Sequence, residues 1–150
     1  MPAFNNPEKF AFPKDIRLKC SRCALCCGDT ESRSRTILML ESEAERISRR
    51  TTKSVFEFAS KKEDTEPYAY VMKKTPKGSC VFLAGHLCTI YDSRPLICRF
   101  YPFKLVDQNE KYVFSVTHEC PGVGDGRKLK KRFFEGLFAE LKKSMRQNSQ

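Results

Sequence analysis

Residues 20–27 read Cys-Ser-Arg-Cys-Ala-Leu-Cys-Cys, which places four thiols within eight residues. The first three cysteines have the spacing C-x2-C-x2-C, and this spacing lets successive thiolates curl around one soft metal centre. Four more cysteines follow, at Cys80, Cys88, Cys98 and Cys120. The stretch therefore predicts a cysteine-ligated metal centre around which the rest of the chain folds.

The chain has 150 residues, and 40% of them are hydrophobic, which fits one domain with a modest core that a metal would help to stabilise. Residues 1–19 contain no apolar run of the kind found in a secretory signal, and no stretch is long enough to span a bilayer. We therefore expect a cytoplasmic protein without membrane contact. Thiols stay reduced in that compartment, so clustered cysteines more often bind metal than form disulfides.

The formal net charge of +10 has several readings. Each ligating cysteine would be a thiolate, so part of the positive excess is expected to balance an anionic metal–thiolate centre. The remainder is compatible with a solvated basic surface, with an acidic protein partner or with nucleic acid. Of these, nucleic acid is the less favoured partner.

Hydrophobic patterning predicts an α+β fold, a single domain over 1–150 with a small antiparallel sheet, short helices and a long C-terminal helix. Ser42 and Glu45 resemble a capping box that would start a helix over 43–50. The other expected elements are a helix over 55–61, a helical turn at 92–95, strands over 36–40, 68–72 and 79–83, a hairpin of 103–106 with 112–117, and a helix over 125–146.

The C-terminal helix shows an apolar stripe at four-residue steps, while lysines occupy its other side. We expect this stripe to pack on the sheet rather than on a membrane or nucleic acid. The stripe consists of Leu129, Phe133, Leu137, Leu141 and Met145, and Phe134 and Phe138 widen it.

Two kinds of metal centre compete for residues 20–27. Zinc sites commonly use C-x2-C pairs, and Cys20, Cys23 and Cys26 supply two overlapping pairs. Bacterial ferredoxins use a C-x2-C-x2-C run with a remote Cys-Pro, and Cys120 precedes a proline here, which favours a 4Fe–4S cluster. Adjacent cysteine side chains are expected to diverge. Three roles therefore stay open for Cys27: a ligand of a second site, a thiol next to the centre, or a core residue.

Each of Cys80, Cys88 and Cys98, taken alone, is compatible with an inert buried thiol. All three follow turns that can aim a side chain, so together with the cluster they favour ligation within reach of residues 20–27. Arg94 and Arg99 stand near Cys98, where a guanidinium can donate to sulfur and offset negative charge. An ordinary ion pair, such as Arg94 with a nearby aspartate, is the plainer interpretation.

The combined pattern resembles the YkgJ-like CxxCxxCC cysteine-cluster family of zinc- or iron-chelating domains. The resemblance covers roughly 18–121 and rests on residues 20–27, on Cys-Val-Phe-Leu at 80–83, on Cys-Thr-Ile-Tyr at 88–91, on Arg-Pro at 94–95 and on Cys-Arg at 98–99. The chain departs from the family at Ala24, where glycine is common, and this would stiffen the loop. The resemblance implies that 18–121 is a core that binds a metal or an iron–sulfur cluster.

The resemblance also links the chain to flagellin lysine N-methylase, a larger relative, but nothing here resembles a separate cosubstrate domain. The leading function is a metal-binding protein whose physiological role the sequence does not define. Two alternatives are an iron–sulfur enzyme of redox or methyl-transfer chemistry and a zinc-stapled module that binds nucleic acid. No Ser–His–Asp set, phosphate-binding loop or dinucleotide fingerprint assigns catalytic residues.

Overall fold

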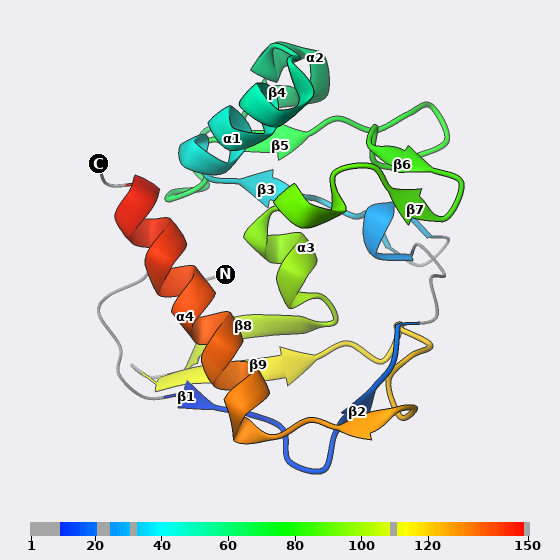
Figure 1. Cartoon of the computed structure of the whole chain (residues 1–150), viewed down its shortest axis with the longest axis vertical. Coiled ribbons are helices and arrows are strands. Elements are labelled where there is room, and N and C mark those ends of the chain that lie inside the picture. Colours follow the sequence, from blue (N-terminus) through cyan, green and yellow to red (C-terminus); the bar gives the residue numbers. More distant parts are fainter. Residues whose placement is uncertain (1–9, 21–24, 31–32, 109–110, 149–150) are drawn as a thin grey trace.

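The computed structural model describes residues 10–20, 25–30, 33–108 and 111–148 (Figure 1). It confirms an α+β fold that combines several small sheets with a C-terminal helix. The helices are η1 (Leu25–Cys27), α1 (Glu41–Thr51), α2 (Val55–Phe58), η2 (Tyr91–Ser93), α3 (Leu96–Phe100) and α4 (Lys131–Asn148). None of the described helices is long and apolar enough to cross a membrane.

The strands form four small sheets rather than the one that the sequence predicts. The two larger ones have the orders β1-β9-β8 and β3-β5-β4, and the two smaller ones pair β10 with β2 and β6 with β7. The strands are β1 (Phe10–Ala11), β2 (Arg17–Leu18), β3 (Leu38–Met39), β4 (Ala59–Lys61), β5 (Tyr70–Met72), β6 (Leu83–Ala84), β7 (Leu87–Cys88), β8 (Phe103–Gln108), β9 (Lys111–Val116) and β10 (Arg127–Lys128).

The β8–β9 hairpin confirms its prediction and extends it by two residues on the first strand. Tyr112 and Phe114 alternate with more exposed neighbours and are buried, as the period of a half-buried strand requires. Phe10 pairs in parallel with Tyr112, so β1 adds a third strand to this hairpin. The sequence predicted an irregular lead-in before residue 20, because two-residue strands are too short to show alternation.

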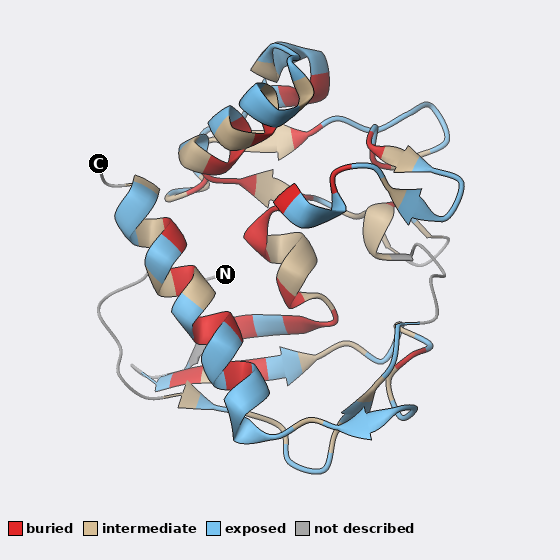
Figure 2. Ribbon diagram, viewed as in Figure 1, coloured by how far each residue is buried: buried red, intermediate tan, exposed pale blue. Residues whose placement is uncertain are grey.

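Helix α4 begins at Lys131 and not near residue 125, because 127–128 pair with β2 instead. It buries Leu137 and Leu141 of the predicted stripe, together with Phe134 and Phe138, which widen it, but not Phe133. Phe134 is fully buried while Phe133 is 38% exposed. The Phe134 ring lies 5.0 Å from that of Phe103 and 5.2 Å from that of Phe114, centroid to centroid. The predicted packing on the sheet is confirmed, with Phe134 rather than Phe133 as its anchor (Figure 2).

Helix α1 starts two residues before its predicted position, with Leu40 as the N-cap residue. The Glu43 carboxylate accepts a hydrogen bond from the Leu40 amide at 3.0 Å, which is the half of a capping box that a leucine N-cap allows. The predicted box of Ser42 with Glu45 does not form. Glu43 prevails because a glutamate three residues after the N-cap reaches back to its amide.

Other short elements also shift. The predicted helix over 55–61 stops at Phe58, and 59–61 become β4, paired with β5. The predicted strand over 79–83 is replaced by isolated bridges at Ser79 and Cys80. The turn expected at 84–86 is confirmed, and it joins β6 to β7 with Gly85 at φ 63°.

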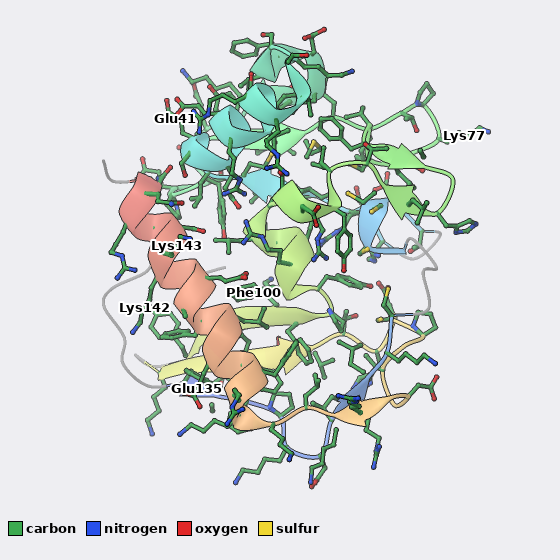
Figure 3. The ribbon with its side chains drawn as sticks, viewed as in Figure 1. Glu41, Lys77, Phe100, Glu135, Lys142 and Lys143 are labelled. Atoms are coloured by element: carbon green, nitrogen blue, oxygen red, sulfur yellow. The ribbon has the colours of Figure 1, made fainter. Side chains whose placement is uncertain are left out.

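Two apolar clusters form the core. One packs α3 and α4 on the β8–β9 hairpin, and Phe100 lies at its centre (Figures 2 and 3). The other packs α1 and α2 on the β3-β5-β4 sheet and includes buried Cys80. Cys27, Cys88 and Cys98 pack against the edge of this second cluster. The fold thus brings cysteines from three separated segments to one side of one core.

Candidate metal centre

The cysteine-rich stretch is fixed to residues 78–80 by backbone pairing. The Asp29 amide donates to the Gly78 carbonyl at 2.9 Å, and the Cys80 amide donates to the Cys27 carbonyl at 2.5 Å. Gly28 makes this approach feasible, since a Cβ there would lie 3.0 Å from the Gly78 carbonyl oxygen. Cys80 therefore lies directly beside Cys27, although the two are 53 positions apart along the chain.

A tight hairpin carries Cys88 back to the same place. Cys88 pairs with Leu83 in the β6–β7 register, and the Leu83 amide donates to the Cys80 carbonyl at 3.0 Å. The Thr89 amide and hydroxyl both donate to the Phe82 carbonyl. Cys80 and Cys88 thus bracket one compact turn, and their ligation of a shared metal remains a prediction. Figure 3 shows sulfur atoms gathered between η1 and this hairpin.

Cys98 is delivered by α3. Pro95 is the N-cap residue, and the Cys98 amide donates to the Pro95 carbonyl at 3.0 Å. The start of the helix is held by Glu43, whose second carboxylate oxygen accepts a 2.7 Å hydrogen bond from the Leu96 amide. A carboxylate at a helix N-terminus is favourable, because it satisfies an amide that lacks a partner within the helix.

The Cys26 and Cys27 sulfurs lie 3.9 Å apart, so these adjacent side chains do not diverge as the sequence suggested. A hydrogen bond from the Cys27 thiol lowers the pKa of Cys26 to about 6, and the same bond raises the pKa of Cys27. The thiolate at Cys26 is thus stabilised by its neighbour.

The remaining thiols act on one another electrostatically. Burial chiefly raises the pKa of Cys98 to about 12, and the negative charges of Cys80, Cys26 and Cys88 add to the effect. Burial also raises the pKa values of Cys80 and Cys88, with smaller contributions from Cys26. The charge of Cys26 thus acts on each of the other four thiols, those of Cys27, Cys80, Cys88 and Cys98. Several thiolates there would repel each other unless a cation joins them.

Arg35 is the functional residue that the sequence did not single out. Its Nε donates to the Cys26 carbonyl at 2.9 Å, and its charge lowers the pKa values of Cys26, Cys80 and Cys98 against the effect of burial. The Asp29 carboxylate holds the Arg35 amide at 2.6 Å and is itself paired with Lys74 at 2.9 Å. The sequence does show a basic residue, Arg35, at the end of the polar stretch 29–35 that follows the cysteines. Nothing in the sequence distinguishes it from the other charged residues of that stretch.

The two predicted arginines lie in different places. Arg94 stacks on the Tyr91 ring at 3.8 Å, and its charge lowers the pKa values of Cys26 and Cys88. Arg99 reaches α4, where it pairs with Glu140 at 3.3 Å, and it also donates to the Arg94 carbonyl. Its predicted contact with the sulfur centre remains a prediction.

Cys20 and Cys120 lie in two segments that pair with each other outside the named strands. The Lys19 amide donates to the Gly122 carbonyl at 3.0 Å, which brings the segments that carry these two cysteines side by side. The charge of Cys120 also acts on Tyr101, as does that of Cys26. Cys23 lies outside the described residues, so the predicted sharing of one centre by Cys20, Cys23 and Cys26 remains a prediction.

No disulfide links the seven described cysteines. Within the described ranges, no group of three or more His, Cys, Asp or Glu side chains is already arranged to hold a metal ion. The donor set nevertheless suits a soft metal, being made of thiols with two guanidinium groups nearby. One nitrogen of Arg35, Nη2, is buried and has no hydrogen-bond partner among the described residues. An anionic metal–thiolate group is the type of partner that such a nitrogen needs.

Comparison with known proteins agrees with this site. Residues 19–121 match the CxxCxxCC family, described as "Putative zinc- or iron-chelating domain". An uncharacterized protein of Methanocaldococcus jannaschii is 27% identical over 130 residues, which are 83% of this chain and 43% of that protein. The chain thus spans less than half the length of this relative. No solved structure gives a significant match. The matched region includes all eight cysteines, and the chain belongs to the CxxCxxCC family of zinc- or iron-chelating domains.

Proposed function

We propose that the protein binds a metal through the thiolates of Cys26, Cys27, Cys80, Cys88 and Cys98, four of which are enough for a tetrahedral ion. The observation that carries this proposal is that the fold brings Cys27, Cys80, Cys88 and Cys98 to one core cluster, with the Cys26 sulfur 3.9 Å from that of Cys27. Arg35, which bonds the Cys26 carbonyl, also has a buried nitrogen without a hydrogen-bond partner among the described residues. A metal would replace the repulsion among thiolates by attraction. It would also bind the η1 loop, the β6–β7 hairpin and α3 to each other.

Arg35 and Arg94 would serve the bound metal through their charge. A group of four thiolates around one divalent ion carries a net negative charge, and two adjacent guanidinium groups would offset it. Asp29 and Lys74 would act indirectly, because they fix the backbone from which Arg35 extends. Cys88 also lines a cavity of about 320 Å³ together with Arg50 and Asp92, so this one proposed ligand borders an open space.

Zinc and an iron–sulfur cluster are both supported by particular features. Two sulfurs on one tetrahedral zinc ion lie about 3.8 Å apart when each zinc–sulfur bond is about 2.3 Å. The 3.9 Å between the Cys26 and Cys27 sulfurs is close to this separation and favours a single ion. The spacing of Cys20, Cys23 and Cys26 with Cys120-Pro121 favours a 4Fe–4S cluster.

Anaerobic purification followed by elemental analysis tests the proposal and separates the two metals. One equivalent of zinc per chain and no visible absorption are the results expected for a zinc site. Iron with acid-labile sulfide and a brown colour are expected for a cluster. Protein that is fully reduced and folded, yet carries neither metal and binds neither when it is added, would contradict the proposal.

A further inference from the structure

A cavity of about 440 Å³ is lined by Arg35 and Tyr101 among others, and its volume is within the usual size range of small-molecule sites. It is bounded by the segment that leads into β3, by the end of α3 and by strands β8 and β9. None of its lining residues is a cysteine. The cavity is therefore a feature separate from the candidate metal centre, although Arg35 belongs to both.

One part of the cavity wall is apolar. Leu38, Ile97 and Val116 line it and are only partly buried, so they present apolar surface to whatever enters. Buried Phe100 and Phe103 form part of the wall behind them. A ligand with an apolar body would cover this surface and gain from its removal from water.

The charge at the cavity is positive. Three cationic side chains line it, namely Arg33, Arg35 and Lys104, against a single carboxylate, that of Glu119. Glu119 pairs with Arg33, so the positive charge of Arg35 and Lys104 exceeds the negative charge of the walls. Both Arg33 and Arg35 lie over the Tyr101 ring, with guanidinium carbons 5.9 and 5.1 Å from its centroid, and this holds their charge at one side of the cavity.

We propose that this cavity binds a small organic carboxylate, with its apolar body against Leu38, Ile97 and Val116 and its charge toward Arg35 and Lys104. The inference goes beyond the metal centre and does not rest on it. Its consequence is that Arg35, which lines the cavity and also bonds the Cys26 carbonyl, would link the bound anion to the cysteine-rich stretch.

Benzoate is a suitable probe, with benzyl alcohol as its neutral counterpart and inorganic phosphate as an anion without an apolar body. Binding can be followed by amide chemical shifts of the purified full chain. We expect saturable shifts for residues 33–38, 101–104 and 115–117 with benzoate. Benzyl alcohol and phosphate should bind at least about tenfold more weakly than benzoate. Absence of saturation by about 20 mM benzoate, or equal binding of either counterpart, would overturn the inference.

Charge reversal supplies the matched test. Lys104→Glu should weaken benzoate binding by about tenfold, whereas Lys111→Glu, which reverses an exposed charge outside the cavity lining, should change it by less than about twofold. Equal effects of the two substitutions would overturn the proposal. Metal content is measured on the same samples, so a chain that binds benzoate as expected but takes no metal would refute the metal centre and leave the carboxylate site standing.

Discussion

The carboxylate of Glu43 accepts a 2.7 Å hydrogen bond from the backbone amide of Leu96, across 53 positions of the chain. Its other oxygen bonds the Leu40 amide, and the side chain is only 1% exposed. Glu43 therefore connects the first turn of α1 to the first turn of α3. Because α3 carries Cys98, this buried carboxylate helps to set the position of one of the proposed ligands.

Glu43→Gln should lower the free energy of unfolding by about 1–3 kcal/mol, because a glutamine offers one carbonyl oxygen and leaves one buried amide without an acceptor. Urea denaturation measures the change. Glu45→Gln is the control on the same helix, since Glu45 is exposed, and it should change stability by less than about 0.5 kcal/mol. A larger loss for Glu45→Gln than for Glu43→Gln would contradict the assignment of the cap.

Burial raises the pKa of Glu43, and hydrogen bonds from Leu40 and Leu96 only partly oppose this effect. A carboxyl whose pKa is higher in the folded chain favours folding most below its unfolded pKa of 4.5, and this contribution falls as pH rises through the folded pKa. The stability difference between wild type and Glu43→Gln should therefore shrink as pH increases above about 4.5. Paired denaturation curves across this range provide the measurement, and a difference that grows with pH would refute the sign.

Phe134 should be the anchor of α4. Phe134→Ala is expected to cost about 3–5 kcal/mol, because it removes a fully buried ring that packs on Phe103 and Phe114. Phe133→Ala is the neighbouring control and should cost clearly less, since that ring is 38% exposed. Thermal or denaturant unfolding of the two variants decides the matter, and the reverse order of costs would show that the helix is rotated.

Gly28 should be required for the approach of the η1 loop to Cys80. Gly28→Ala places a Cβ 3.0 Å from the Gly78 carbonyl oxygen and should lower both stability and metal content. Gly136→Ala is the matched control, because a Cβ there meets nothing within 4 Å and alanine favours the helix by about 1 kcal/mol. Unchanged metal binding in Gly28→Ala would mean that this close pairing is dispensable for the centre.

The sequence predicted the parts of the fold whose signal is local and long. The β8–β9 hairpin and α4 each repeat an apolar pattern over many residues, so their existence was predictable, although the anchor residue of α4 was not. One residue of phase separates Phe133 from Phe134, and the β2–β10 pairing that delays the helix start comes from segments more than 100 residues apart. Strands of two residues, such as β1, carry too little pattern to be recognised.

For the site, cysteine spacing predicted membership of a metal-chelating family, and a short turn precedes each of Cys80 and Cys88 as predicted. Ligation by these two cysteines remains a prediction. The contribution of Arg35 could not be predicted in the same way. The position of Arg35 depends on the Asp29 carboxylate, which accepts a hydrogen bond from the Arg35 amide. That carboxylate is in turn paired with Lys74, which lies far away in the sequence. Arg94 and Arg99 look equivalent beside Cys98 in the sequence. In the fold, Arg94 lies before α3 begins, whereas Arg99 lies on α3 and pairs with Glu140 of α4.

The central claim is that sulfurs from distant segments bind one metal. Metal content per chain in Cys98→Ser tests it most directly, because Cys98 lies on α3, far in sequence from the cysteine-rich stretch. Anaerobically purified wild type and Cys98→Ser are compared by elemental analysis after folding is verified by circular dichroism. The account predicts that the variant loses most of its metal or binds it far more weakly. An unchanged metal content in folded Cys98→Ser protein would contradict it.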